Sequence, residues 1–227
     1  MLDKATNNCR VVVLISGNGT NLQALIDRQT ADELPITIVA VVSNRPGVLG
    51  LERAAKAGIP TISLDHTAFA DRERFDKVLA SKIDQYQPDL LVLAGFMRIL
   101  TPGFVRQYQG KMLNIHPSLL PKYQGLNTHQ RAIDAGDKIH GVTVHFVTNE
   151  LDGGPPIIQA QVPVAGDDTA DTLAKRVQAQ EHIIYPMAVK WFAEGELSMA
   201  ENKAYLAEQQ LPAKGFQFVK QTKVAHA

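Results

Sequence analysis

The sequence predicts an α/β fold in which a mostly parallel, twisted sheet of about seven strands carries helices on both faces. Two observations lead to this prediction. Short, β-branched, apolar segments alternate with helix-like segments through the first half of the 227 residues, as is typical of βαβ units. Hydrophobic residues make up 45% of the chain, the composition of an ordinary globular protein that can bury a sizeable core.

Each element is predicted from its hydrophobic period and its flanking residues. The predicted strands are residues 10–16, 36–43, 61–64, 90–94, 111–115, 141–147 and 157–164. The predicted helices are residues 20–28, 49–57, 71–86, 128–135 and 171–194. Thr20 and Gln23 form a capping-box pattern at the start of the first helix, and Gly58 and Pro60 end the second. The last helix carries an apolar stripe, which we interpret as core.

The domain organisation is predicted to be simple. No repeat, low-complexity tract or linker divides the sequence, so we expect a single domain over residues 1–227. Residues 1–9 would form a short N-terminal extension, and about 212–227 a C-terminal tail. The part from about Leu197 is weakly patterned and is expected to be partly mobile. Residues 117–125 contain turn formers and predict a loop long enough to cover a site.

Charge and cysteine content exclude several classes of partner. Lys and Arg total 23, as do Asp and Glu, so no net field would attract nucleic acid or an anionic membrane. The single Cys9 cannot form an internal disulfide, and no Cys/His cluster has zinc spacing. The apolar run 11–15 is too short for a signal peptide or a membrane span. These features predict a cytoplasmic protein without a metal.

A glycine-rich loop predicts an anion site. Residues 16–21 lie between an apolar strand and a helix, where backbone amides and the positive end of the helix would meet an anion. The loop has neither the Lys-Ser/Thr pair of a P-loop nor the third glycine of a dinucleotide site. We therefore expect a phosphate monoester bound by Gly19, Thr20 and Asn21. The alternative is a tight turn that binds nothing.

Three polar residues suggest acyl-transfer chemistry. Asn114 and His116 are two positions apart at a predicted strand end and would project from the same face. Asp152 follows a later strand on a Gly/Pro-rich turn, and a loop at the same edge of the sheet could bring its carboxylate to the imidazole. An Asn amide and a His N–H can donate to a tetrahedral oxyanion, at roughly 3–4 kcal/mol for one donor. A nearby carboxylate would orient the His and favour its protonated form.

Each of these residues has a structural alternative, because Asn, His-Pro and Asp-Gly-Gly are common in turns and loops. Four other histidines have no such company and are expected to be structural or exposed. They are His129, His140, His145 and His182, of which His145 is the best candidate for a place behind the site.

Four ordered segments make the sequence resemble the glycinamide ribonucleotide formyltransferases, from Val11 to about Leu211. These are VVLISGNGTNLQ (12–23), LAGFMRIL (93–100), NIHPSLLP (114–121) and LDGGP (151–155). The resemblance implies the Rossmann-like formyltransferase fold. It also implies transfer of a formyl group from 10-formyltetrahydrofolate to the amine of 5-phosphoribosyl-glycinamide, in de novo purine biosynthesis. No metal would be needed, the partners would be small-molecule substrates, and the protein would be a monomer or a homodimer.

The resemblance also implies roles for individual residues. Asn114, His116 and Asp152 match the family's catalytic residues. Gly19, Thr20 and Asn21 would hold the substrate phosphate, with Glu181 on the ribose. The folate would lie beside Met97, Arg98, Ile99, Leu100, Asn114, Val147 and Leu151, with Arg72 near its benzoyl-glutamate end. The chemistry of these residues agrees in part with the implied folate site, because the run 96–100 is apolar enough to cover a flat pterin. A buried strand end is the alternative for that run.

Three positions depart from the family pattern. Gln124 and Asn127 stand where Pro and His are expected, and Asn149 stands where an acid is usual. These departures would alter the mobility of the loop after Pro121 and the electrostatics around the pterin.

Four alternative functions are compared with this prediction. A methionyl-tRNA formyltransferase is expected to have a further C-terminal domain and a basic face. A formyltetrahydrofolate deformylase is expected to have an N-terminal regulatory domain. A sugar-nucleotide formyltransferase is possible, although the 18–21 loop and Glu181 favour a phosphoribosyl substrate. A non-catalytic phosphoribosyl-binding module would need none of the three polar residues.

Overall fold

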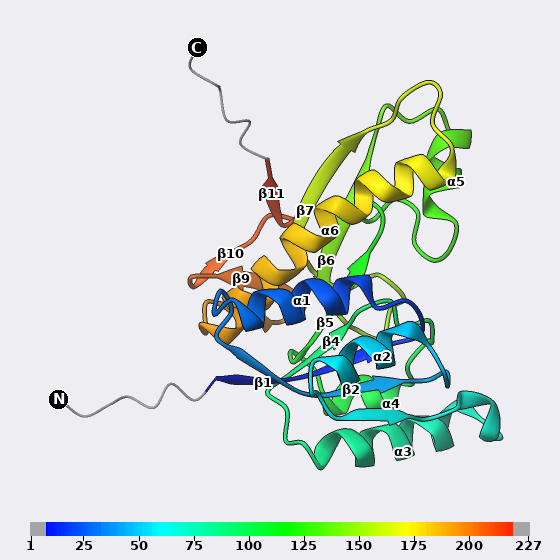
Figure 1. Cartoon of the computed structure of the whole chain (residues 1–227). Coiled ribbons are helices and arrows are strands. Elements are labelled where there is room, and N and C mark those ends of the chain that lie inside the picture. Colours follow the sequence, from blue (N-terminus) through cyan, green and yellow to red (C-terminus); the bar gives the residue numbers. More distant parts are fainter. Residues whose placement is uncertain (1–7, 220–227) are drawn as a thin grey trace.

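The computed structural model describes residues 8–219 and contains two sheets (Figure 1). The larger has eight strands in the order β11-β7-β6-β5-β4-β1-β2-β3. Its strands are β1 (Cys9–Ile15), β2 (Ile36–Ser43), β3 (Thr61–Ser63), β4 (Leu90–Leu93), β5 (Met112–His116), β6 (Ile139–Phe146), β7 (Pro156–Pro163) and β11 (Phe216–Phe218). Neighbouring strands are parallel except at β5–β6 and β6–β7. The predicted mostly parallel sheet is confirmed, with eight strands rather than about seven.

Helices cover both faces of this sheet, as predicted (Figure 1). They are α1 (Thr20–Thr30), α2 (Leu49–Lys56), α3 (Arg72–Asp84), α4 (Pro102–Gln107), α5 (Thr128–Asp134) and α6 (Ala170–Ala193), with a 3₁₀ turn η1 (His66–Ala68). Alternate residues of β1 point to opposite faces: Val11 and Val13 pack with α1 and α6, whereas Val12 and Leu14 pack with α3 and α4. Both faces of β1 are therefore buried from Val11 to Ile15, as in a central parallel strand.

The short helix α4 was not predicted. Thr101 caps it by accepting a hydrogen bond from the Phe104 amide, and Pro102 occupies its first turn. This Thr-Pro pair is a recognisable start signal, but the helix has only six residues and therefore shows little hydrophobic period.

The C-terminal part is more ordered than the sequence predicts. The second sheet, of three antiparallel strands, contains β8 (Leu197–Ala200), β9 (Lys203–Leu206) and β10 (Gln209–Gln210). Residues 212–219, expected to be part of a tail, include β11, which pairs in parallel with β7 at the sheet edge. Residues 212–219 therefore do not form a separate tail, and residues 197–210 contain strands that the sequence analysis did not predict. Residues 1–7 and 220–227 lie outside the described residues.

The sheet order places a topological switch point between β1 and β4. The chain proceeds from β1 to β2 on one side and continues with β4 on the other, so the loops that follow β1 and β4 separate at this point. Such a switch point at the carboxyl ends of parallel strands is the usual ligand site of an open α/β sheet. No helix among residues 8–219 is both long and apolar enough to cross a lipid bilayer.

Candidate active site

The glycine loop after β1 leaves the first amides of α1 without a side-chain cap. Gly19 is the N-cap residue, in the left-handed region at φ 68°, and it makes no side-chain hydrogen bond. The predicted capping box is therefore wrong, and Gln23 instead donates to Asp27 Oδ1 at 2.8 Å. Gly50 of α2 donates its amide to the Gly17 carbonyl at 3.0 Å. The uncapped helix start is thus held in place and has donors available for an anion.

Glu181, although 160 positions away, joins the same site from α6. Its Oε2 accepts a hydrogen bond from Asn21 Nδ2 at 2.8 Å. Burial raises the pKa of Glu181, and the Asn21 hydrogen bond partly opposes this shift. Gln178, which the sequence analysis did not single out, donates to Thr20 Oγ1 at 3.1 Å from one turn earlier in α6. The structure therefore brings together Thr20, Asn21 and Glu181 of the predicted phosphoribosyl site.

Asn114 is oriented by His145. The two residues are opposite each other in the β5–β6 register, and Asn114 Nδ2 lies 3.1 Å from His145 Nε2. His145 Nδ1 lies 2.8 Å from the Phe146 carbonyl, which can only accept, so Nδ1 carries the proton. Nε2 of the neutral ring therefore accepts from Asn114. Burial lowers the pKa of His145, which favours this neutral form.

His116 and Asp152 meet in a buried pair. His116 Nδ1 lies 3.4 Å from Asp152 Oδ2, and their side chains are 8% and 9% exposed. His116 Nε2 donates to the Tyr123 carbonyl at 2.9 Å, and the Gly125 amide donates to Asp152 Oδ2 at 2.9 Å. The 117–125 loop thus touches both members of the pair. The three predicted catalytic residues share one site, since Asp152 Oδ1 also lies 3.9 Å from His145 Nε2.

Asp152 reaches the site by a route different from the one expected. The sequence analysis placed its loop at the same sheet edge as the end of β5. However, β6 runs antiparallel to β5, with Phe146 opposite Leu113 and Thr143 opposite His116. The β6–β7 loop therefore leaves beyond the start of β5, and it folds back over the sheet to bring Asp152 to His116.

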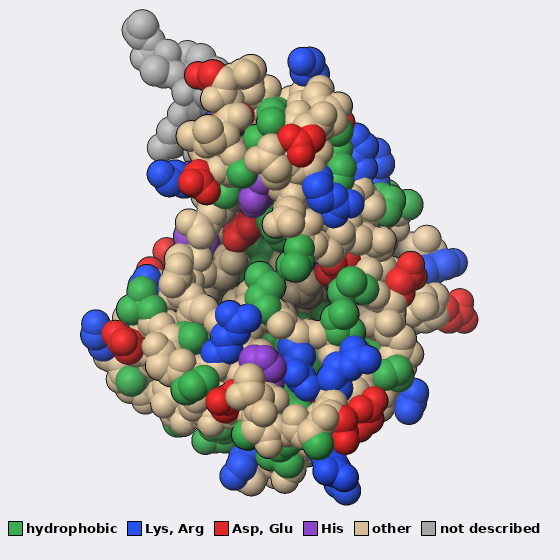
Figure 2. Space-filling model, turned by 90° about the vertical axis from the view of Figure 1, so that its right-hand side faces the viewer, with side chains coloured by type: hydrophobic (Ala, Val, Ile, Leu, Met, Phe, Trp, Pro, Cys, Tyr) green, Lys and Arg blue, Asp and Glu red, His purple; other side chains and the backbone are tan. Residues whose placement is uncertain are grey.

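A narrow pocket of about 100 Å³ adjoins these residues. It is lined by Leu93, Phe96, Ile99, Leu100, Val105, Asn114, His145 and residues 147–152. Of the predicted folate contacts, Ile99, Leu100, Asn114, Val147 and Leu151 line it. Figure 2, which faces the right-hand side of Figure 1, shows a hollow near the centre of this surface with hydrophobic side chains around it.

Three predicted folate contacts do not line this pocket. The Arg98 guanidinium lies over the Phe75 ring, 4.2 Å from its centroid. Met97 is 62% exposed, and Arg72 is an exposed residue at the start of α3. A ligand that also contacts these residues would have to extend beyond the pocket. His145 and Val105 are lining residues that the sequence analysis had not counted as folate contacts, whereas Phe96 belongs to the run 96–100 that was expected to cover the pterin.

The remaining polar cluster supports the 117–125 loop. His129 Nδ1 lies 3.1 Å from His140 Nε2, so each of these two histidines has a hydrogen-bond partner in the other. Burial, together with the neighbouring His129, lowers the pKa of His140 to about 4. The Tyr123 hydroxyl donates to Asp137 Oδ2 at 2.8 Å. These contacts fix the segment whose carbonyl holds His116.

Two of the departures from the family pattern lie in this loop region. Gln124 Nε2 donates to the Asp152 carbonyl at 3.4 Å, and Asn127 precedes α5 in the left-handed region at φ 58°. Asn149 lines the pocket. Within residues 8–219, no group of three or more His, Cys, Asp or Glu side chains is arranged to hold a metal ion.

Comparisons with known proteins agree with this geometry. Residues 9–189 match the family described as formyl transferase. The chain is 56% identical over 206 residues to phosphoribosylglycinamide formyltransferase of Escherichia coli K12, covering 91% of this chain and 97% of that protein. It is 48% identical over 193 residues to the trifunctional purine biosynthetic protein adenosine-3 of Bos taurus, covering 85% of this chain but 19% of that protein.

The fold is shared with a solved enzyme. The structure of phosphoribosylglycinamide formyltransferase from Coxiella burnetii matches with a TM-score of 0.90 and 51% identity, covering 94% of this chain and all of that one. Sequence and structure therefore agree that this chain belongs to the formyl transferase family.

Proposed function

We propose that this chain transfers the formyl group of 10-formyltetrahydrofolate to the amine of 5-phosphoribosyl-glycinamide, forming formylglycinamide ribonucleotide and tetrahydrofolate in purine biosynthesis. The observation that carries the proposal is the buried His116–Asp152 pair beside Asn114, in a molecule that also has an uncapped, glycine-rich helix start. The enzymatic relatives support the same reaction. A binding module would need the helix start but not the buried pair.

Asn114 and His116 would stabilise the transition state. The substrate amine attacks the formyl carbon, and the carbonyl oxygen becomes an oxyanion. The second N–H of Asn114 is free to donate to it, because the first is held by His145. His116 would donate from Nδ1, because Nε2 is occupied by the Tyr123 carbonyl. Asp152 would stabilise the protonated imidazole.

Proton transfer completes the reaction. The attacking amine loses one proton, the bond from the formyl carbon to N10 of the folate breaks, and N10 gains one proton. His116, in reach of Asp152, would carry this proton. No other reactant is required for atoms and charge to balance.

The two substrates would lie on opposite sides of these groups. The phosphate would bind at Gly19, Thr20 and Asn21, with the ribose near Glu181. The pterin would enter the pocket beside its apolar side chains, Phe96, Ile99, Leu100 and Val147. Met97, Arg98 and Arg72 stay proposed contacts for parts of the folate outside this pocket. We further propose a cytosolic enzyme, monomeric or homodimeric, whose described residues act as one domain.

The deciding experiment follows tetrahydrofolate release from 10-formyltetrahydrofolate with and without 5-phosphoribosyl-glycinamide. We expect release only with the amine. Release without it would indicate a hydrolase, and release only with an amino-sugar nucleotide would indicate the sugar-nucleotide branch. We expect His116→Ala to lower kcat by roughly 10²–10⁴-fold while ligands still bind. His66→Ala, on η1, is the matched control, and a His116→Ala enzyme with near wild-type kcat would exclude the proton-carrying role.

A further inference from the structure

The glycine loop (residues 16–21) carries less positive charge than the proposed phosphate ligand requires. A phosphate monoester carries about −1.5 to −2 at neutral pH, whereas a helix start supplies roughly +0.5. The chain has no net charge, so the protein as a whole adds no attractive field. Glu181 adds a carboxylate that is hydrogen-bonded to Asn21 of the same loop. A cation beside the loop is therefore needed to balance the site.

Arg53 of α2 is held against this loop by two hydrogen bonds. Its Nε donates to the Asn18 carbonyl at 2.8 Å, and one terminal nitrogen donates to Gln23 Oε1 at 3.2 Å. Within residues 8–219 the second terminal nitrogen makes no hydrogen bond or ion pair. The guanidinium is thus oriented at the loop while part of its donor capacity stays available.

Close packing of α2 on the loop brings Arg53 to this position. A Cβ on Gly19 would lie 2.7 Å from the Gly50 Cα and 3.6 Å from the Arg53 Cδ. Only glycines allow the two backbones to approach this closely. Because Gly50 and Arg53 are three positions apart on α2, both project toward the loop.

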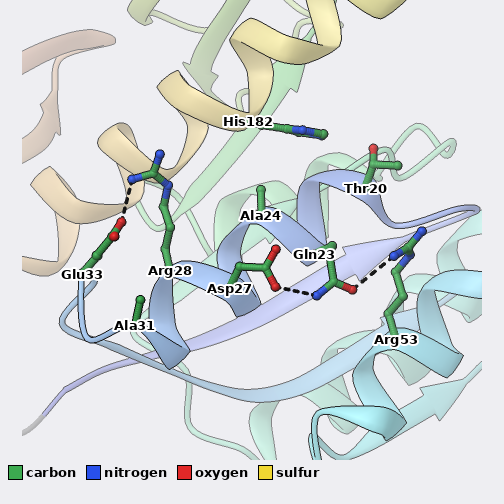
Figure 3. Close-up of a pocket in the computed structure, with 9 residues that line it drawn as sticks. All are labelled: Thr20, Gln23, Ala24, Asp27, Arg28, Ala31, Glu33, Arg53 and His182. Carbon is green, nitrogen blue, oxygen red and sulfur yellow. Dashed lines mark hydrogen bonds and ion pairs between the residues drawn. The ribbon is translucent and has the colours of Figure 1, made fainter.

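Arg53 and Thr20 lie at one end of a groove of about 630 Å³ along α1 (Figure 3). His182 faces this end from α6. At the other end, Arg28 forms an ion pair with Glu33 at 2.9 Å (Figure 3). Arg28 is already neutralised by this carboxylate, whereas Arg53 has no acidic partner within the described residues.

We infer that Arg53 is a phosphate-binding residue that supplies the positive charge missing from the glycine loop and selects the phosphorylated form of the amine substrate. This inference rests on the proposed function for the identity of the substrate. The guanidinium keeps its two bonds to the loop and faces the phosphate with its remaining N–H groups. It acts on substrate binding and leaves the chemical step unchanged.

Steady-state kinetics test the inference. We expect Arg53→Gln to raise KM for 5-phosphoribosyl-glycinamide about tenfold, equivalent to about 1.4 kcal/mol. The kcat and the KM for 10-formyltetrahydrofolate should stay within about twofold. Arg53→Lys keeps the charge but not the two hydrogen bonds, so it should stay within about threefold of the wild type. Arg28→Gln removes the same charge from the same groove and is expected to change no constant.

Two measurements separate charge from a merely structural role. With the dephosphorylated amine, glycinamide riboside, the wild type and Arg53→Gln should have equal kcat/KM. Calorimetric titration with ribose 5-phosphate should show about tenfold weaker binding to Arg53→Gln, and a smaller effect of raising the salt concentration. This titration needs no formyl transfer, so it tests Arg53 even if the amine acceptor proves to be another compound.

The inference is wrong if Arg53→Gln binds ribose 5-phosphate as the wild type does. It is equally wrong if the Gln and Lys variants lose affinity to the same extent, or if the riboside is affected as much as the phosphorylated substrate. The first result would show that Arg53 does not contribute to phosphate binding, and either of the other two would assign Arg53 to holding the loop. Thermal unfolding of each variant verifies that it is folded. If Arg53→Gln is not folded, the Arg53→Lys variant decides the test.

Discussion

Asn114 and His145 are opposite each other across β5 and β6, with the Asn114 amide nitrogen 3.1 Å from the unprotonated nitrogen of the His145 ring. The Phe146 carbonyl holds the other ring nitrogen and thereby determines the tautomer. One amide N–H of the proposed oxyanion donor is therefore tied down, and the other has a defined direction. A donor whose direction is set before the reaction loses no free energy to reorientation during it.

His145→Phe should therefore lower kcat although the ring never touches the reacting atoms. The Phe ring fills the space but cannot accept from Asn114, so the amide loses its orientation. We expect a loss of about tenfold, below the roughly 10²–10³-fold expected for removing the donor by Asn114→Ala. His145→Gln offers an acceptor again and should recover part of kcat. A His145→Phe enzyme with unchanged kcat would show that Asn114 needs no support.

Asp152→Asn should reduce kcat and leave both KM values nearly unchanged. In the wild type, Asp152 Oδ2 lies 3.4 Å from His116 Nδ1. The amide of the variant keeps the shape of the side chain but cannot stabilise a protonated His116. General acid–base catalysis contributes roughly 10²–10⁴-fold, and a loss in this range is expected in steady-state assays. Asp167→Asn, at an exposed position, should have no effect. Loss of substrate binding with unchanged kcat would contradict the proposed role.

Gly19→Ala should weaken both stability and substrate binding. Gly19 has φ 68°, and an added Cβ would lie 2.7 Å from the Gly50 Cα, which belongs to the backbone and cannot easily move. We expect the free energy of unfolding to fall by about 1–3 kcal/mol in urea titrations. The KM for the phosphorylated substrate should rise, because the amides of the loop are displaced. Gly166→Ala is the control, since nothing lies within 4 Å of its Cβ.

Glu181→Gln should stabilise the protein at neutral pH and weaken substrate binding. Burial raises the pKa of Glu181 above 4.5. As pH rises from 4.5, the unfolded chain loses this proton first, so stability falls until the folded pKa is passed. The Gln variant avoids this loss and still accepts from Asn21. We expect a higher Tm at pH 7–8, by about 2–4 °C per kcal/mol, and no difference near pH 4.

The same variant should raise KM for 5-phosphoribosyl-glycinamide, because a carboxylate is a stronger acceptor for ribose hydroxyls than an amide. Differential scanning calorimetry across pH, together with kinetics, measures both effects. A Gln variant that is less stable at pH 7–8 would mean that the charge of Glu181 is compensated in the folded protein.

Local sequence was sufficient to predict much of the fold and part of the site. The βαβ order, the glycine loop at 16–21 and the shared face of Asn114 and His116 depend on neighbours within a few positions. Strand alternation, helical period and glycine backbone freedom act over this range, so they can be predicted from the chain alone. The apolar run at 96–100 is of the same kind, and Ile99 and Leu100 do line the pocket.

Only the tertiary structure decided which distant residues meet. The antiparallel direction and register of β6 pair His145 with Asn114 and send the loop of Asp152 back over the sheet. The packing of α6 on α1 brings Glu181 to Asn21, and that of α2 brings Arg53 to Asn18. Strand direction and helix packing follow from burial of the whole core, and no short segment contains that information.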